Sequence, residues 1–149
     1  MKRILSISLI LSLTLLCFTA CSSEMSITDE YYTDYDGVYI SIEEIDSTAD
    51  FPTLKVIWHN ETTDLITFGL WYTVEYLDGD EWINIQIVDY AIPEIACQLE
   101  ANSTAEQSYA TKYFNMLRPG TYRIRTEFYV PDANIGAQST WTLFKASYL

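Results

Sequence analysis

Apolar and polar residues alternate along most of the chain after Gly37. The clearest run places Val38, Ile40 and Ile42 in one phase and polar neighbours in the other. Alternation of this kind is typical of a β-strand that buries one face. We therefore predict about eight short strands, at residues 38–42, 54–58, 68–76, 82–87, 95–99, 106–111, 122–128 and 144–148.

The connections between these runs are short and rich in turn residues. Asp78-Gly79-Asp80 favours a hairpin turn, because Asp-Gly readily adopts the positive φ that such turns require. Residues 101–103 predict a second turn, and residues 115–117 at most a single helical turn. Strands without crossover helices indicate antiparallel sheets, so the pattern predicts an all-β sandwich or barrel.

A corner-like motif precedes the strand at residues 122–128. Pro119 and Gly120 suit the centre of a type II turn, because proline fixes φ and glycine accepts a positive φ. Leu117 and Tyr122 flank this turn, and the Tyr122 ring falls in the core phase. We expect the Tyr122 hydroxyl to bond to the preceding loop, as in the tyrosine corner of Greek-key sandwiches.

The ordered set of these segments resembles a family of bacterial immunoglobulin-like domains found mainly in lipoproteins and exported proteins of Gram-positive bacteria. The resemblance begins at Thr53 and covers roughly two thirds of the chain. It implies an immunoglobulin-like antiparallel β-sandwich of about seven or eight strands, and it implies no catalytic or binding residues. The matching segments are residues 54–62, 72–75, 78–82, 99–103, 117–123 and 144–148.

The amino terminus has the order of a secretory signal peptide. Lys2 and Arg3 precede an uncharged, mostly apolar run at residues 4–18, which is too short to span a bilayer comfortably. Residues 18–21, Phe-Thr-Ala-Cys, resemble the lipobox of bacterial lipoproteins. The resemblance implies cleavage of residues 1–20, lipid attachment at Cys21, and a place on the extracytoplasmic side of the cell membrane.

The rest of the chain divides into two parts. Residues 21–36 are polar and acidic without periodicity, which predicts a flexible tether, and residues 37–149 form the domain. Loss of Lys2 and Arg3 leaves six basic residues against 21 acidic ones, so the net charge changes from −13 to −15. Such a surface repels phosphates, which excludes nucleic acid as a partner.

Catalytic and metal-binding patterns are incomplete. Cys97 has no disulfide partner in the domain, and His59 is the single histidine, so neither a zinc site nor a supported cysteine–histidine pair is expected. Asp34, Asp36 and Glu43 overlay part of a calcium loop, but Tyr32 occupies its first ligand position. We expect no enzyme activity, no cofactor and no metal.

Aromatic residues are the remaining functional signal. The chain has twelve tyrosines and four tryptophans, and Trp71 falls in the outward phase of its strand. Exposed aromatic rings anchor protein interfaces and also stack on sugars. We therefore expect an interaction module that binds another envelope protein. The alternative is a domain that binds wall glycan or a small ligand through a face containing Trp71.

Overall fold

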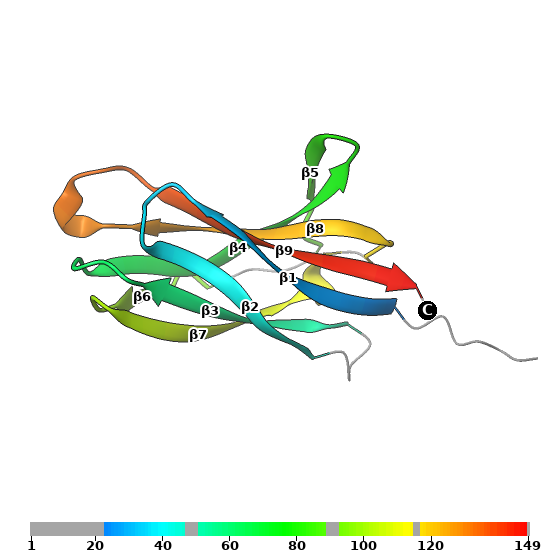
Figure 1. The fold of residues 1–149 in the computed structure, drawn as a ribbon, viewed down its shortest axis with the longest axis horizontal. Coiled ribbons are helices and arrows are strands. Elements are labelled where there is room, and N and C mark those ends of the chain that lie inside the picture. Colours follow the sequence, from blue (N-terminus) through cyan, green and yellow to red (C-terminus); the bar gives the residue numbers. More distant parts are fainter. Residues whose placement is uncertain (1–22, 47–50, 89–92, 115–116, 149) are drawn as a thin grey trace, which may run out of the picture.

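The computed structural model of the protein describes residues 23–46, 51–88, 93–114 and 117–148. In this part of the chain, nine strands form two packed sheets, with no α-helix (Figure 1). Two short 3₁₀ turns, Thr111–Tyr113 and Pro131–Ala133, lie between strands. The strands are β1 (Ser23–Thr33), β2 (Val38–Asp46), β3 (Thr53–Asn60), β4 (Ile66–Asp78), β5 (Glu81–Ile85), β6 (Ala96–Leu99), β7 (Ser103–Ala110), β8 (Gly120–Tyr129) and β9 (Gln138–Tyr148).

The larger sheet, sheet A, has the strand order β1-β9-β8-β4-β5, and the smaller sheet, sheet B, has the order β2-β3-β7. β6 also belongs to sheet A, where it pairs with Ile66–Gly69 of β4 while β5 pairs with Val74–Asp78. All of these pairings are antiparallel. The predicted all-β antiparallel sandwich is therefore confirmed.

The alternating positions form the core between the two sheets. In β3, buried and half-buried residues alternate along the whole strand, and Trp58 is fully buried. The Trp58 ring stacks on Phe68 of sheet A, with ring centres 4.3 Å apart, and meets Phe128 edge-on at 6.0 Å. Such aromatic contacts between the two layers bury large apolar areas and stabilise the packing of one sheet on the other.

The structure corrects the tether prediction for residues 21–36. Ser23–Thr33 form β1, which runs antiparallel to β9, with a bulge between Ile27 and Tyr31. β1 is an edge strand, and several of its side chains are exposed, among them Ser26, Asp29 and Glu30. A strand with so little buried surface lacks the alternation that reveals the other strands, which is why the sequence pattern missed it.

The corner before β8 differs from its prediction in one respect. The Tyr122 hydroxyl donates a hydrogen bond to the carbonyl of Arg118 at 2.5 Å, and the Tyr122 ring is buried. Gly120, however, has φ = +154° and begins β8, whereas a type II turn requires a φ near +80°. Glycine is needed here because a Cβ would overlap the Tyr76 ring.

Several predictions concern residues outside the described part. These are the signal peptide, the lipidated Cys21, and the helical turn at residues 115–117, of which only Leu117 is described. In the described ranges, no helix has the length and apolar composition needed to cross a membrane.

Candidate interaction face

The outer face of sheet A collects the side chains that alternate with the core residues of β4, β5, β8 and β9. Three of the four tryptophans lie on this face, and Trp58 in the core is the fourth. Their separation in the sequence hides this grouping, because it depends on the strand order. We call this surface the aromatic face and define it by Trp71, Trp82, Arg123, Arg125 and Trp141.

Arg123 on β8 organises the centre of the aromatic face. Its guanidinium carbon lies 4.4 Å from the centre of the Trp82 ring and 5.4 Å from that of Trp141. Its Nε donates a hydrogen bond to the carboxylate of Glu75, which is buried on the neighbouring strand β4. A planar guanidinium can stack on rings and pair with a carboxylate at once, so Arg123 holds both tryptophans in place.

β1 extends this row of stacked groups. The ring of Tyr32 stacks on Trp141 with centres 5.7 Å apart, and Tyr32 is half exposed. Tyr32, Trp141, Arg123 and Trp82 therefore form a continuous ladder, with one residue each from β1, β9, β8 and β5 of sheet A. The contacts restrain these side chains before any partner arrives.

Trp71 lies apart from the ladder and is 53% exposed. The register of β4 against β8 shifts between Phe68 and Tyr72, so Trp71 sits within a bulge of β4. Its backbone carbonyl accepts a hydrogen bond from the Thr126 hydroxyl at 2.8 Å. Bulges commonly re-aim a side chain, and this one presents the indole of Trp71 to solvent.

A small polar hollow adjoins Trp71 on the aromatic face. Its volume is about 90 Å³. Arg125 donates a hydrogen bond to the Ser139 hydroxyl at 2.8 Å, and it forms no ion pair within the described residues. Guanidinium, amide and carboxylate groups around one hollow provide both donors and acceptors. The lining residues are Trp71, Thr73, Glu75, Asn84, Arg125, Thr126 and Glu127.

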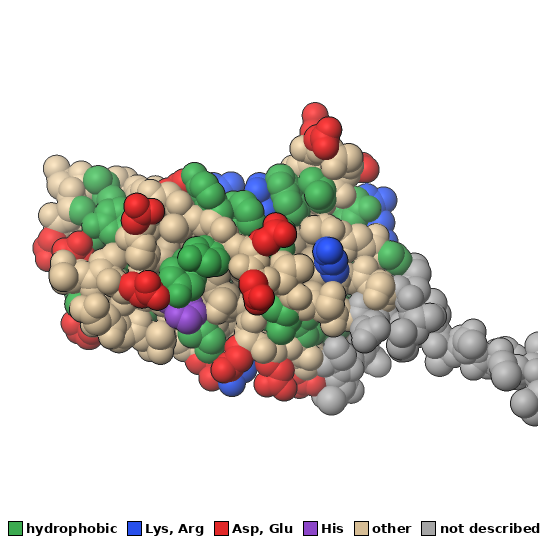
Figure 2. Space-filling model, in the orientation of Figure 1, with side chains coloured by type: hydrophobic (Ala, Val, Ile, Leu, Met, Phe, Trp, Pro, Cys, Tyr) green, Lys and Arg blue, Asp and Glu red, His purple; other side chains and the backbone are tan. Residues whose placement is uncertain are grey.

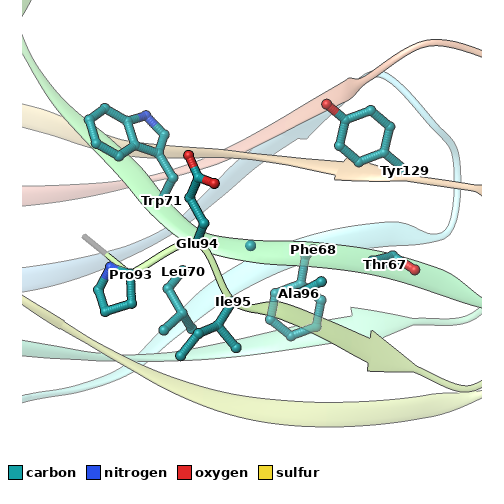
Figure 3. Close-up of a pocket in the computed structure, with 10 residues that line it drawn as sticks. Thr67, Phe68, Leu70, Trp71, Pro93, Glu94, Ile95, Ala96 and Tyr129 are labelled. Atoms are coloured by element: carbon teal, nitrogen blue, oxygen red, sulfur yellow. The ribbon is translucent and has the colours of Figure 1, made fainter. Parts of the chain in front are cut away.

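An apolar groove of about 300 Å³ begins on the other side of Trp71. Figure 3 shows its walls, which come from β4, from the segment that leads into β6, and from the end of β8. Ile95 and Tyr129 are each 51% exposed at its rim. Trp71 thus separates a polar hollow from an apolar groove.

His59, the only histidine, lies on the outer face of sheet B. Its ring stacks on Tyr39 at 4.4 Å, and its Nε2 lies 2.8 Å from the Ser41 hydroxyl. Burial lowers the pKa of His59. Cys97 is half-buried on β6 of sheet A, so the structure does not bring the cysteine and the histidine together.

The residues of the partial calcium loop have other partners. A carboxylate oxygen of Asp34 accepts a hydrogen bond from the Ser139 backbone at 3.0 Å, and Glu43 pairs with Lys55 at 2.7 Å. Within the described ranges, no group of three or more His, Cys, Asp and Glu residues is arranged to hold a metal ion.

Sequence reasoning found Trp71 but missed the ladder. The phase opposite the core in β8 contains Arg123 and Arg125, and the same phase in β9 contains Trp141. Phase assignment therefore places each of these residues on an outer face. The order of β5, β8 and β9 in the sheet, which the sequence does not show, brings them together.

Two packed antiparallel sheets without an α-helix in the described residues are the architecture of an immunoglobulin-like sandwich. A family model described as bacterial Ig-like domain matches residues 34–142, and the chain belongs to this family. Domains of this family are generally non-catalytic. No curated protein matches the chain. The matched region begins at residue 34, directly after β1 ends at Thr33.

Proposed function

We propose that this protein is a lipid-anchored, non-catalytic interaction module of the cell envelope that binds another envelope protein through the aromatic face. One observation carries the proposal: three tryptophans and two arginines gather on one outer face of the sandwich. Tryptophan, tyrosine and arginine are the residues that most often dominate the binding energy of protein interfaces.

The ladder also lowers the cost of binding. Association costs free energy when flexible side chains become ordered at an interface. Arg123 is already held between Trp82 and Trp141 and is paired with Glu75, so little of that cost remains. The apolar groove beside Trp71 offers a recess for an apolar side chain of the partner.

The proposed location at the membrane is supported by the sequence alone. Lys2, Arg3, the apolar run at residues 4–18 and the small residues before Cys21 support export and lipid attachment. A diacylglyceryl group at Cys21 would provide two chains, which hold a protein on a membrane where a single chain is marginal.

Site-specific photocrosslinking in cells of the source organism tests the protein partner. A photoreactive amino acid replaces Asn84 on the aromatic face, or Thr104 on the outer face of sheet B as the control; both positions are exposed. We expect one dominant envelope protein to be crosslinked from position 84 and not from position 104, and Trp71→Ala to remove that product. Equal products from both positions, or none from position 84, would contradict the proposal.

A saccharide of the cell wall is the second candidate ligand, and the polar hollow favours it. Trp71 offers an open ring face, and Asn84, Arg125 and Glu127 can exchange hydrogen bonds with hydroxyl groups. Titration with soluble wall fragments, followed by tryptophan fluorescence, tests this candidate. Saturable binding that Asn84→Ala and Trp71→Ala both weaken would support it, and no change in fluorescence would exclude it.

A further inference from the structure

The segment between the lipidation position and the family domain is a strand of sheet A. β1 begins at Ser23, two residues after Cys21. Two residues of extended chain span at most about 7 Å. A lipid on Cys21 would therefore be attached very close to the point where β1 enters the sheet.

Several interactions fix β1 to the sandwich. The hydroxyl of Thr28 donates to the carbonyl of Leu143 at 3.1 Å, and that of Thr140 donates to the carbonyl of Tyr32 at 2.9 Å. The Tyr31 ring stacks on Tyr39 of β2, with centres 4.3 Å apart. β1 is thus tied to sheet A by its backbone and to sheet B by an aromatic contact, which excludes free swivelling at this segment.

The two ends of the sandwich differ in charge. At the end opposite Ser23, the loops at residues 33–37, 60–65, 99–102 and 130–137 contain six acidic residues and no basic residue. The end where β1 begins contains both signs of charge: Lys112, Arg118 and Lys145 lie there together with Asp46 and the acidic β4–β5 hairpin, Asp78, Asp80 and Glu81. Figure 2 shows blue and red side chains together over the centre and right of the molecule, and red ones but no blue at its left end.

We propose that β1 is a rigid stem that stands the sandwich on the membrane, with the Ser23 end at the headgroups and the acidic end pointing away. The inference rests on the lipid anchor of the proposed function. A bilayer with anionic lipids repels the acidic loops and so favours the same direction. Tyr32 lies nine residues beyond Ser23, so the upper part of the aromatic face lies about 30 Å above the anchor point.

This geometry defines the kind of partner. A domain on a long flexible tether can reach proteins at many heights, whereas a domain on a short stem presents its face within a narrow zone above the bilayer. The partner is therefore a membrane-bound protein whose exposed part meets the aromatic face sideways, within about 30 Å of the headgroups.

Fluorescence quenching on vesicles tests the orientation. The full lipidated chain with Cys97→Ser is placed in phosphatidylcholine–phosphatidylglycerol vesicles whose headgroups carry a short-range nitroxide quencher. A fluorophore is attached through Lys145→Cys near the Ser23 end or through Asp132→Cys at the acidic end; both side chains are exposed. We expect quenching at position 145 to exceed that at position 132 several-fold.

A lengthened variant supplies the matched control. Insertion of about twelve Gly and Ser residues between Ser22 and Ser23 introduces a flexible linker of about 20 Å. This linker should reduce quenching at position 145 to the value at position 132. If the protein without the insertion floats with the vesicles but shows equal quenching at both positions, the proposed orientation by β1 is wrong and the lipid anchor remains supported. Protein that fails to float overturns the anchor and the stem together.

Discussion

The two outer faces of the sandwich arise from the same strand pattern but differ in chemistry. On sheet A, Arg123 and Glu75 form an ion pair whose side chains are 16% and 10% exposed, covered by tryptophan rings. On sheet B, Lys55 bridges Glu43 and Glu106 at 2.7 and 3.2 Å, and the two glutamate side chains are more than half exposed. Similar charges thus form a rigid, partly dry surface on one side and a solvated one on the other.

The difference shows what makes a sheet face suitable for binding. Solvated ion pairs contribute little to stability, and their side chains move freely. A guanidinium held under indole rings is already ordered and partly desolvated. Ser108 lies opposite Lys55 on sheet B, and Ser41 and Thr104 follow on the same face opposite Ile57 and His59. The aromatic face therefore holds its central cation among rings, whereas Lys55 on sheet B stays solvated and the stacked rings of that face, Tyr31, Tyr39 and His59, do not enclose it.

The largest expected loss of folding stability comes from the inner side of sheet A, and it serves as the reference for substitutions on the two outer faces. Tyr122→Ala should lower the free energy of unfolding by about 3–5 kcal/mol, because it empties a fully buried aromatic position. Tyr122→Phe keeps the ring but removes the hydrogen bond to Arg118, and it should cost about 1 kcal/mol. Urea denaturation measures both values, and a neutral Tyr122→Ala would show that the corner does not support the sheet.

Removal of the central cation on each face compares the faces directly. Arg123→Ala leaves the Glu75 carboxylate buried without its partner and should cost about 2–4 kcal/mol. Lys55→Ala removes an exposed pair and should cost less than about 1 kcal/mol. If thermal or urea unfolding shows that both substitutions lower the free energy of unfolding equally, the two faces do not differ in this way.

Trp71→Ala separates binding from stability. Because the indole is more than half exposed, the free energy of unfolding should change by less than about 0.5 kcal/mol. Affinity for the partner should fall at least about tenfold, or about 1.4 kcal/mol, as for an interface hot spot. Ile57→Ala, a half-buried position on the outer face of sheet B, is the control in the same pull-down or titration. Equal loss of affinity from both variants would mean that the aromatic face is not the binding surface.

The smallest expected effect is a pH dependence on the outer face of sheet B. Burial lowers the pKa of His59 below its usual value of 6.5, so the unfolded chain binds this proton more readily than the folded one. Stability from this residue is therefore complete above pH 6.5 and is lost as the pH falls toward the lowered pKa. His59→Gln should flatten this part of the curve of unfolding free energy against pH. An unchanged slope would show that His59 does not contribute to it.

Local sequence pattern predicted the strands that bury one face, and it placed Trp71 on the outside. β2, β3 and β8 follow the alternation closely, and Gly79 has the positive φ expected of the Asp78–Asp80 turn. The pattern could not reveal β1, because an edge strand with exposed side chains looks like any polar segment. The close approach of the Tyr76 ring to Gly120 also escaped prediction, because the local sequence around Gly120 does not show it.

The sequence by itself determined the fold class, because period-two alternation is a local property that each strand carries within itself. Only the tertiary structure decided which outward residues meet. Trp82, Arg123 and Trp141 come from three strands, and their contact depends on strand order and register. The same is true of β1, whose place beside β9 is set by hydrogen bonds to residues more than a hundred positions away.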